Sequence, residues 1–292
     1  MGKKTVVFGS FVVDLMGRTP HLPAAGETVK GTVFKMGPGG KGFNQGVAAH
    51  KAGADVTMVT KLGRDSFADI ALNTMKDLGM KQDRILYSDD TETGCALIMV
   101  DENTSQNEIV VILGSCNTIS DAEVDSLEDL LDGSEYLLTQ LETNVSSVER
   151  IVDIACKKGV KVILNTAPIQ PISDELLSKV DLITPNEVEA EILTGVKVDS
   201  EEAADKAAEW FFHKGVKRVL ITLGGRGVYI NTRDKKGIIP AYKVNAIDTT
   251  GAGDAFNGGL LAALAEDKDI WDAADFANAL AALSVQKIGT TP

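Results

Sequence analysis

The sequence has few of the residues from which metal centres, disulfide frameworks and nucleic-acid surfaces are built. Its 292 residues include three cysteines and three histidines, which are scattered along the chain without a CxxC pair. This spacing fits neither a zinc site nor a disulfide framework. Lysine and arginine number 29 against 42 aspartates and glutamates, which gives a net charge of −13. We therefore expect no nucleic-acid partner, because phosphate backbones are held by clustered basic side chains. A nucleotide can still bind through backbone dipoles.

Long hydrophobic runs are also missing. No apolar stretch approaches the ~20 residues that span a bilayer, so we expect no membrane partner. The N-terminal Met-Gly-Lys-Lys lacks a signal-peptide layout, and Val6 stands where a myristoylation motif requires Ser or Thr. The expected location is the cytoplasm.

Aromatic residues make up only 5% of the chain, whereas Ala, Val, Ile and Leu are plentiful. Short β-branched runs such as Val6–Phe8 and Arg218–Thr222 alternate with helical patterns such as Glu201–His213. This alternation predicts an α/β fold with a mostly parallel sheet and helices on both of its faces. Ligands in such folds bind at the C-terminal ends of the strands.

Two stretches break the alternation, at approximately residues 11–37 and 94–113. The first is extended, and the second predicts the two strands Cys95–Val100 and Glu108–Leu113. Both indicate antiparallel additions to a single domain spanning residues 1–292. We expect them to form a small inserted β-sheet that covers the site as a lid. An ordinary surface hairpin is the alternative.

The run Asp248-Thr249-Thr250-Gly251-Ala252-Gly253-Asp254 carries the strongest indication of chemistry. Its small residues let backbone N–H groups converge, and the helical pattern from Ala255 to Leu264 puts those groups at a positive helix end. Asp254 stands at the same spot, so a base lies beside donors for a developing negative charge. Phosphoryl transfer to an alcohol requires such a pair. A glycine-rich turn in which Asp254 merely starts the helix is the alternative.

A second glycine-rich cluster covers Gly37–Gln45. It is not a Walker A motif, because Lys35 stands where that motif needs glycine and Gly42 where it needs Ser or Thr. The first strand does not open a GxGxxG fingerprint either. The cluster instead offers backbone N–H groups, the Lys41 ammonium and the Asn44 amide on a flexible turn. Such a set can bind the hydroxyls of a small polar ligand, and a plain surface turn is the alternative.

Polar residues follow several predicted strands. Asp14 and Glu142 carry carboxylates suited to orienting sugar hydroxyls. Asn186 and Glu189 precede a helix, where they fit a capping pair, a phosphate contact or water-mediated Mg²⁺ binding. The turn Thr222–Gly227 suits close approach by a nucleotide. Each has a plain alternative, namely a solvated carboxylate, a helix cap or a surface turn.

Together and in this order, these segments resemble the ribokinase (PfkB-type carbohydrate kinase) family over essentially the whole chain. The resemblance implies a three-layer α/β/α ribokinase-like fold with a small β-sheet lid. It also implies transfer of the γ-phosphoryl group of ATP to the 5-hydroxyl of D-ribose, with Mg²⁺ and K⁺ as cofactors, and a homodimer formed through the lid. The segments that carry the resemblance are Gly39–Gln45, Gln140–Glu142, Thr184–Glu191, Ile221–Gly224 and Asp248–Asp254.

The resemblance also implies a role for individual residues. Asp254 would be the base, beside an anion hole formed by Gly251, Ala252 and Gly253. Asp254 would also bind the sugar, together with Asp14, Gly40, Lys41, Gly42, Asn44 and Glu142. The nucleotide would bind to Asn186, Thr222, Leu223, Gly224, Gly225, Arg226, Gly227, Gly253 and Asn278. Glu189 would contact Mg²⁺ through water, and the K⁺ positions are Asp248, Thr250, Ser284, Lys287 and Gly289.

Two features depart from the family pattern. Val12 stands where many ribokinases have an asparagine that touches the sugar, and losing that hydrogen bond would relax or redirect the choice of acceptor. Relatives also continue beyond the position of Pro292, where one potassium ligand normally lies, which leaves the strength of cation binding open. Deoxyribose, another pentose or ketose, or a nucleoside is therefore an alternative acceptor. A non-catalytic sugar- or nucleotide-binding protein is the alternative from another class, and the missing fingerprint disfavours a nicotinamide-dependent dehydrogenase.

Overall fold

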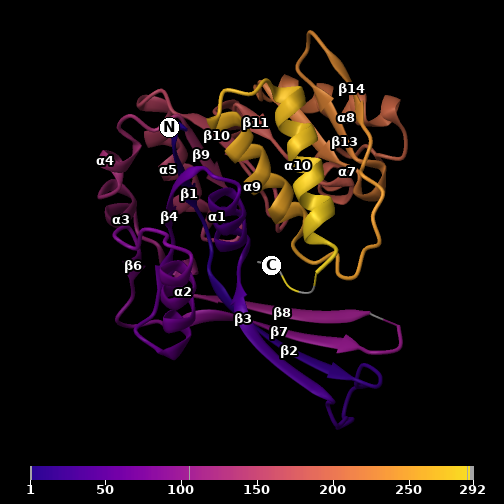
Figure 1. The fold of residues 1–292 in the computed structure, drawn as a ribbon. Coiled ribbons are helices and arrows are strands. Elements are labelled where there is room, and N and C mark those ends of the chain that lie inside the picture. Colours follow the sequence, from indigo (N-terminus) through magenta and orange to yellow (C-terminus); the bar gives the residue numbers. More distant parts are fainter. Residues whose placement is uncertain (1, 105, 288, 290–292) are drawn as a thin grey trace.

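A central sheet of eight strands runs through the computed structural model, which describes residues 2–104, 106–287 and 289 (Figure 1). Pro292, beyond which the resemblance implies a further potassium ligand, lies outside these residues. In order across the sheet, the strands are β14 (Lys236–Ile239), β13 (Val228–Asn231), β12 (Arg218–Thr222), β11 (Leu182–Ile183), β10 (Lys161–Leu164), β9 (Tyr136–Thr139), β1 (Lys4–Phe8) and β4 (Asp55–Val59). Neighbours from β12 to β4 are parallel, whereas β13 and β14 add an antiparallel edge. The mostly parallel sheet is confirmed.

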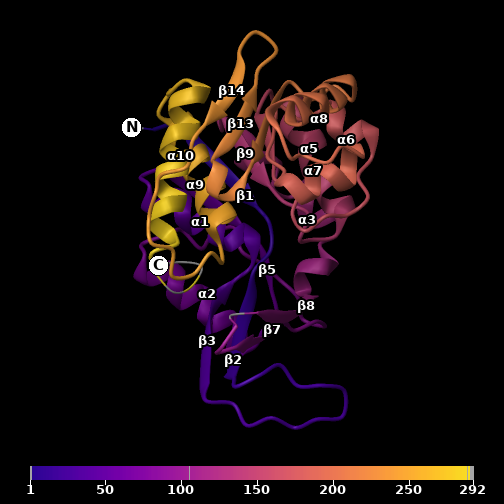
Figure 2. The same cartoon turned by 90° about the vertical axis from the view of Figure 1, so that its right-hand side faces the viewer.

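Helices cover both faces of this sheet, as Figure 2 shows. Val7 and Leu138 belong to a buried apolar cluster on one face, and Val6 and Leu137 to a cluster on the other. This division follows from the alternation of side chains along a strand. One layer contains α1 (Lys41–Lys51), α2 (Ser66–Asp77), α9 (Ala252–Ala265) and α10 (Ile270–Ser284). The other contains α3 (Asp121–Asp125), α4 (Glu128–Leu131), α5 (Val145–Lys157), α6 (Asp174–Ser178), α7 (Glu187–Thr194) and α8 (Glu201–His213). The predicted three-layer α/β/α architecture is confirmed.

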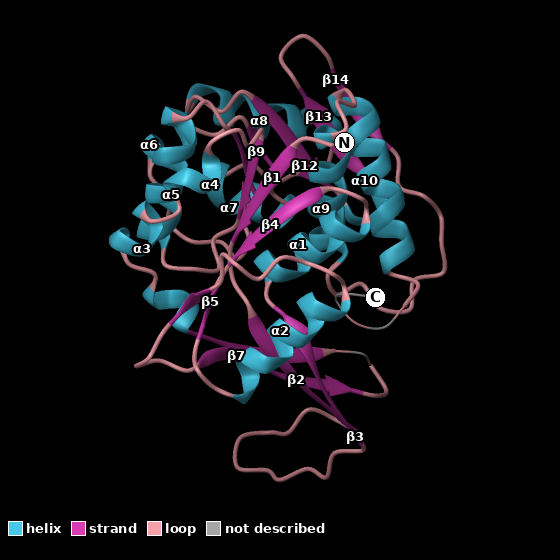
Figure 3. Cartoon of the chain, turned by 60° about the vertical axis from the view of Figure 1, so that its left-hand side comes forward, coloured by secondary structure: helices cyan, strands magenta, loops and turns pink. Residues whose placement is uncertain are grey.

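A small sheet projects from this body (Figure 3). In order, its strands are β3 (Val33–Gly39), β2 (Val12–Thr19), β7 (Thr93–Asp101) and β8 (Asn107–Gly114). The pairs β2–β3 and β7–β8 are antiparallel, but β2 and β7 are parallel, with Asp14 opposite Ala96. The antiparallel pairing predicted for each of the two stretches is therefore confirmed, whereas the parallel pairing that joins them into one sheet was not predicted. Both β2 and β7 leave the body at the same point, Val12 opposite Gly94, and so they run outward in the same direction.

The remaining regular elements are short. They are the strands β5 (Lys61–Leu62) and β6 (Leu86–Tyr87) and the 3₁₀ turns η1 (Ser115–Thr118) and η2 (Gly224–Arg226). Among the described residues, no helix has the length and apolar character needed to cross a bilayer.

The glycine-rich cluster Gly37–Gln45 is not the flexible turn that its composition predicts. It contains the end of β3 and the first turn of α1. Gly40 joins the two elements with a φ of 89°, and a Cβ there would lie 2.8 Å from the Cα of Phe11. Only glycine meets both conditions without strain. The cluster thereby fixes the N-terminal end of α1 beside the first strand of the small sheet.

Candidate active site

Asp254 lies in the first turn of α9, where the C-terminal ends of several strands meet. The helix begins after Gly251, which has a φ of 77°. Asp254 is 8% exposed and faces a cavity of about 190 Å³, hereafter the small cavity. The lining comes from the ends of β10, β11 and β12 and from the first turns of α1, α7 and α9. It includes Lys41, Asn165, Thr184, Asn186, Glu189, Thr222, Gly251, Ala252, Gly253, Asp254 and Asn257.

Two amides hold the Asp254 carboxylate. The side chains of Asn44 and Gln45 donate hydrogen bonds to its Oδ2 (3.1 Å) and Oδ1 (3.0 Å) respectively. Burial raises the pKa of Asp254, while the Lys41 ammonium and these hydrogen bonds oppose the rise. A carboxylate with a raised pKa is better matched to taking a proton from a hydroxyl near neutral pH. The structure thus brings Asp254, Asn44 and Lys41 together as predicted, and it adds Gln45, to which the sequence pattern assigned no role.

The N-terminus of α9 supplies backbone donors to the same cavity. Gly251, Ala252 and Gly253 all line it. The N–H of Ala252 points back to the carbonyl of Thr249 (3.2 Å). The N–H groups of Gly253 and Asp254 belong to the first helical turn, which has no intrahelical acceptors for its donors. Together with the helix dipole, these two N–H groups favour an anion at this position.

Two further carboxylates and an ammonium surround Asp254. Glu142 Oε2 accepts hydrogen bonds from Ser10 Oγ (2.6 Å) and from the backbone N–H of Lys41 (2.7 Å). Burial, and then the charges of Glu142 and Asp254, raise the pKa of Asp14 to about 7. Burial works to lower the pKa of Lys41, but the surrounding carboxylates outweigh it and raise that pKa. Lys41 therefore remains a cation between the carboxylates.

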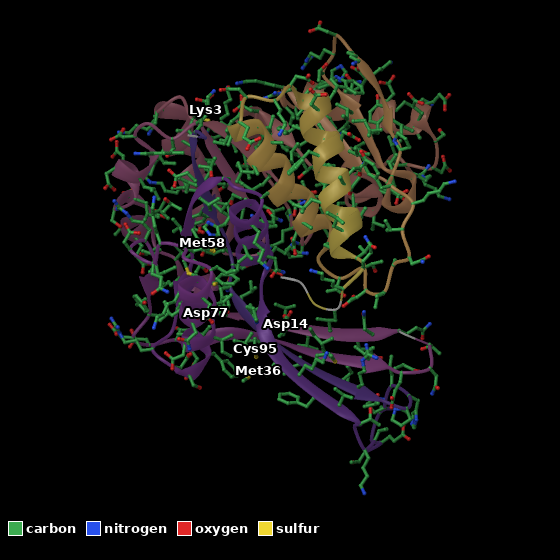
Figure 4. All side chains as sticks on the ribbon, in the orientation of Figure 1. Lys3, Asp14, Met36, Met58, Asp77 and Cys95 are labelled. Carbon is green, nitrogen blue, oxygen red and sulfur yellow. The ribbon has the colours of Figure 1, made fainter. Side chains whose placement is uncertain are left out.

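Asp14 comes from the small sheet, close to the point where that sheet joins the body (Figure 4). Gly39 leaves room for it, because a Cβ at Gly39 would lie 2.2 Å from Asp14 Oδ1. Gly42 permits close packing of α1, because a Cβ there would lie 2.5 Å from the backbone of Gly9. Gly40 and Gly42 therefore shape the predicted sugar site through the backbone.

A larger pocket of about 710 Å³, hereafter the large pocket, adjoins the small cavity. The two share Asn186, Thr222, Thr249, Ala252 and Gly253. Of the predicted nucleotide contacts, the large pocket is lined by Asn186, Thr222, Gly224, Gly225, Gly227, Gly253 and Asn278. The sequence pattern missed one wall, which consists of Tyr242, Lys243, Val244, Ala246, Phe256, Ala281, Ala282 and Val285. The sequence signal for Tyr242–Ala246 and Phe256 is their position beside the Asp248–Asp254 motif, whereas Ala281, Ala282 and Val285 lie at the end of α10 and have no such signal.

Leu223 and Arg226 belong to the predicted turn, but the linings described for the two cavities do not include them. Leu223 is buried in the core. The Arg226 guanidinium pairs with Glu187 and donates to the carbonyls of Val198 (3.0 Å) and Asp199 (3.1 Å). Their side chains therefore anchor the turn to the body while its glycines face the pocket.

Asn186 and Glu189 form a capping box at the start of α7 and also line the small cavity. Asn186 Oδ1 accepts from the N–H of Glu189 (2.8 Å), and Glu189 Oε2 accepts from the N–H of Asn186 (3.0 Å) and from Thr166 Oγ1 (2.9 Å). Within the described residues, no group of three or more His, Cys, Asp or Glu is placed to hold a metal ion. Glu189 supplies one carboxylate to the small cavity, a donor that could hold Mg²⁺ through water while the ion binds mainly to substrate phosphates.

The residues predicted around K⁺ come together only in part. Asp248 accepts from the backbone N–H of Thr250 at Oδ1 (3.0 Å) and of Gly289 at Oδ2 (3.1 Å). Burial works to raise the pKa of Asp248, but these hydrogen bonds outweigh it and lower that pKa. Ser284 Oγ donates to a carbonyl of its own helix (2.9 Å) and the Lys287 side chain is exposed, so a contact from either residue to K⁺ would come through its backbone carbonyl. The Asp248 carboxylate keeps lone pairs that suit a cation.

Comparison with known proteins agrees with this geometry. A ribokinase of Haemophilus influenzae is 45% identical over 99% of this chain and 94% of its own length. A deoxyribokinase of Salmonella typhimurium is 37% identical over 97% of this chain and 93% of its own length. The structure of Arabidopsis thaliana ribokinase complexed with ribose and ATP superposes with a TM-score of 0.92 at 29% identity, covering 100% of this chain and 95% of that one.

A family model spans nearly the whole chain as well. The model described as pfkB family carbohydrate kinase matches residues 3–292. This match, the identity to the relatives and the arrangement around Asp254 agree with one another. The chain therefore belongs to the pfkB family of carbohydrate kinases.

Proposed function

We propose that this chain is an ATP-dependent kinase that phosphorylates the 5-hydroxyl of D-ribose, and that residues 1–292 act as a single kinase domain. The observation that carries the proposal is the buried Asp254 carboxylate, at the N-terminus of α9, where the small cavity meets the large pocket. The lining described for the small cavity includes Lys41 and Asp254 but not Asp14, Asn44 or Glu142, so the sugar would extend from this cavity toward those three residues. The large pocket suits a nucleotide. The ribokinases among the relatives support ribose as the acceptor.

In the proposed reaction, Asp254 takes the proton of the sugar hydroxyl as its oxygen attacks the γ-phosphorus of ATP. The bond from that phosphorus to the β–γ bridging oxygen breaks, and ADP leaves with the bonding electrons. The N–H groups at the start of α9 stabilise the negative charge that develops on the transferred group. Asp14, Glu142 and Lys41 orient the sugar so that one hydroxyl faces Asp254.

The cofactors follow from the donor groups present. Mg²⁺ would be held through water by Glu189 and would neutralise phosphate charge. K⁺ would be held near Asp248 and would support the loop that precedes the anion hole. Neither ion needs a protein cage of several charged side chains, which agrees with the sparse ligand set of the described residues.

The small sheet is proposed as a lid and as a dimer contact. It supplies Asp14, and closing it over the site would exclude water that otherwise hydrolyses ATP. The face of the sheet opposite Asp14 exposes large apolar side chains, including Phe34 (69%), Val110 (59%) and Met36 (53%), which would be covered by a second copy. The free thiols of Cys95, Cys116 and Cys156 are in keeping with the proposed cytoplasmic location.

A second acceptor, 2-deoxyribose, is favoured by Val12. This side chain is 2% exposed and lies two residues before Asp14 on β2, so both point to the same face of the sheet. A valine offers no hydrogen bond, so a sugar that lacks one hydroxyl loses less binding free energy here than it would opposite an asparagine. The deoxyribokinase relatives support this second candidate.

The test is a coupled ADP-release assay with Mg-ATP, with and without K⁺, on ribose, 2-deoxyribose, fructose, fructose 6-phosphate and adenosine. The proposal expects the highest kcat/KM on ribose. A Val12→Asn variant should raise the ratio of ribose to deoxyribose turnover by about tenfold, the worth of one added hydrogen bond. A Val13→Ile variant, which keeps the neighbouring position apolar, is the control and should leave the ratio unchanged. A higher kcat/KM on deoxyribose would contradict ribose as the acceptor, and no ADP release with any of the five would contradict a sugar kinase.

A further inference from the structure

Behind Asp254 lies a chain of three buried side-chain amides that the motifs do not explain. Gln45 is 0% exposed, Gln140 0% and Asn165 7%. Gln140 Nε2 donates to Gln45 Oε1 (2.7 Å), and Gln45 Nε2 donates both to Asn165 Oδ1 (3.1 Å) and to Asp254 Oδ1 (3.0 Å). Buried amides of this kind are costly unless their hydrogen bonds serve a purpose.

The partners fix which way the Gln45 amide points. Asn165 Nδ2 donates to the backbone carbonyl of Thr184 (2.8 Å), so its Oδ1 must face Gln45. The Gln140 Nε2 donor faces Gln45 from the other side. If the Gln45 amide were reversed, its oxygen would face the oxygens of Asn165 and Asp254, and its NH₂ would face the NH₂ of Gln140. The network therefore allows one orientation of Gln45, and that orientation directs an N–H to the carboxylate.

The scaffold keeps this network in place. Gln140 follows β9, Asn165 follows β10 and Thr184 follows β11, so three neighbouring strand ends support one amide. Gln140 lies tightly against Gly9, because a Cβ at Gly9 would be 2.0 Å from Gln140 Oε1. Within the described residues, Gln140 Oε1 has no hydrogen-bond partner. The side chain is therefore held by its single bond to Gln45 and by packing.

We propose that Gln45, oriented by Gln140 and Asn165, is a positioning residue that holds the Asp254 carboxylate in line with the acceptor hydroxyl and keeps it ionised. The proposal rests on the function proposed above, in which Asp254 is the base. Asn44 holds the other oxygen, Oδ2, but Asn44 also belongs to the predicted sugar contacts. Gln45 contacts Asp254 from the side of the strand ends, so its effect on the base is separable from sugar binding.

The charges around Asp254 set the direction of the pH effect. The groups that face it from the neighbouring elements are Lys41 on α1, Asp14 on β2 and Glu142 after β9. Burial and the carboxylates favour the protonated acid, whereas Lys41 and the two amides favour the anion. A hydrogen bond to the charged form lowers a pKa, so removing the Gln45 donor must raise the pKa of Asp254 further.

The test compares Gln45→Met, Gln140→Met and the double variant with the wild-type chain, measuring kcat and both KM values from pH 5 to pH 9. The control is Gln82→Met, because Gln82 Nε2 also donates to a carbonyl, that of Leu72 (2.6 Å), but at the surface. Gln45→Met should lower kcat by about 10- to 100-fold, as small misalignments do. It should leave both KM values within about threefold and move the acid limb of the kcat profile about one unit higher in pH.

Gln140→Met should lower kcat by less, about three- to tenfold, because it acts through Gln45. The kcat of the double variant should match that of Gln45→Met within about twofold, since both substitutions break the same chain of hydrogen bonds to Asp254. The control should match the wild type.

The proposal is overturned if Gln45→Met lowers only the melting temperature and leaves kcat and the acid limb unchanged. It is also overturned if the effects of the two substitutions multiply. Should Gln45→Met fail to fold, Gln140→Met decides alone: a raised acid limb supports the proposal and an unchanged one overturns it. Absence of wild-type turnover would contradict the proposed function and the positioning role with it, whereas normal wild-type turnover with unchanged variants would contradict the positioning role alone.

Discussion

The small cavity and the large pocket meet at the first turn of α9, but they are built from different groups. Side chains that hydrogen-bond to one another dominate the small cavity, where Lys41, Asp254 and Glu189 lie in or near networks of amides and carboxylates. Glycines and alanines supply nearly half of the residues described around the large pocket, and Tyr242, one of its larger side chains, is 48% exposed.

This difference predicts different responses to substitution. In the small cavity, the side chains of Asp254, Asn165 and Glu189 have specific hydrogen-bond partners, so changing one atom leaves another group unsatisfied. In the large pocket, the position of the backbone determines the shape. Truncating a side chain there should therefore raise the KM for ATP only a little, and adding a Cβ should raise it more.

The largest effect is expected for Asp254→Asn. The amide cannot take the proton of the acceptor hydroxyl, so kcat should fall by about 10³-fold, within the range typical of general-base loss. Sugar binding, measured by calorimetry, should survive, because the substitution keeps the size of the side chain. Asp267→Asn is the matched control, since Asp267 is 72% exposed and pairs only with Lys3 among the described residues, and it should leave kcat unchanged. Retention of kcat within tenfold by Asp254→Asn would refute its role as the base.

In the large pocket, the strongest effect is expected from an added methyl group at Gly227. Its φ is 105°, and a Cβ there would lie 2.0 Å from the carbonyl oxygen of Ile239, which precedes the missed pocket wall. The backbone conformation alone costs about 1–3 kcal/mol for a residue with a side chain. We expect Gly227→Ala to raise the KM for ATP by about tenfold and to lower the melting temperature by roughly 5 °C.

The neighbouring Gly225 supplies the control for this substitution. It lines the same pocket, but its φ is not in the left-handed region and a Cβ there would meet no described atom within 4 Å. Gly225→Ala should therefore change the KM for ATP and the melting temperature by much less. Equal effects of the two variants would contradict the view that backbone shape sets this pocket.

The same contrast explains which parts could be predicted from the sequence. Asp254, Lys41 and Asn44 lie in short glycine-marked motifs, but the prediction that they share one site came from the family resemblance that these motifs carry together. The fold class was predictable because the hydrophobic pattern alternates locally. The parallel pairing of β2 with β7 was not, because it joins strands that are far apart in the sequence.

Neither the hydrogen bond from Gln45 that supports Asp254 nor the missed wall of the large pocket could be predicted from the sequence. Gln45 gains its role from Gln140 and Asn165, which are 95 and 120 residues away. A short motif cannot reveal contacts between residues so far apart in the sequence. The wall at Tyr242–Ala246 is irregular backbone, so neither a helical nor a strand period marks it. Glu189 illustrates the opposite case, since the predicted cap is confirmed and the same side chain lines the small cavity, where its binding of Mg²⁺ stays a prediction.

The protonation state of Asp14 predicts a pH dependence of sugar binding. Burial and neighbouring carboxylates raise the pKa of Asp14 to about 7. If its carboxylate orients the sugar, the acceptor KM should fall as the pH rises toward 7, by at most about tenfold per unit, and level off above. Asp14→Asn should remove this pH dependence, measured as acceptor KM from pH 5 to pH 8.5. An unchanged profile in the variant would assign the dependence to another group.

Asp14 should also affect stability, with a sign that follows from the same shift. Folding raises the pKa above its ordinary value of 3.8, so the folded state binds more protons and loses stability as the pH rises from about 4 to 7. Asp14→Asn should remove that loss, so the melting temperature of the variant should exceed that of the wild type by more at pH 8 than at pH 4. An equal difference at both pH values would contradict the raised pKa.

The smallest effect is expected for Tyr242→Phe in the wall of the large pocket. The hydroxyl of Tyr242 donates to the Asp275 carboxylate, whose two oxygens are both 3.0 Å away, but this contact is exposed to solvent. Water replaces an exposed hydrogen bond at little cost, and the phenyl ring keeps the apolar surface of the wall. The KM for ATP should therefore change by less than about twofold, and Asp275→Asn, which keeps an acceptor for the hydroxyl, should behave like the wild type. A tenfold rise for Tyr242→Phe would show that a specific side-chain hydrogen bond shapes the large pocket too, and the contrast between the two regions would then fail.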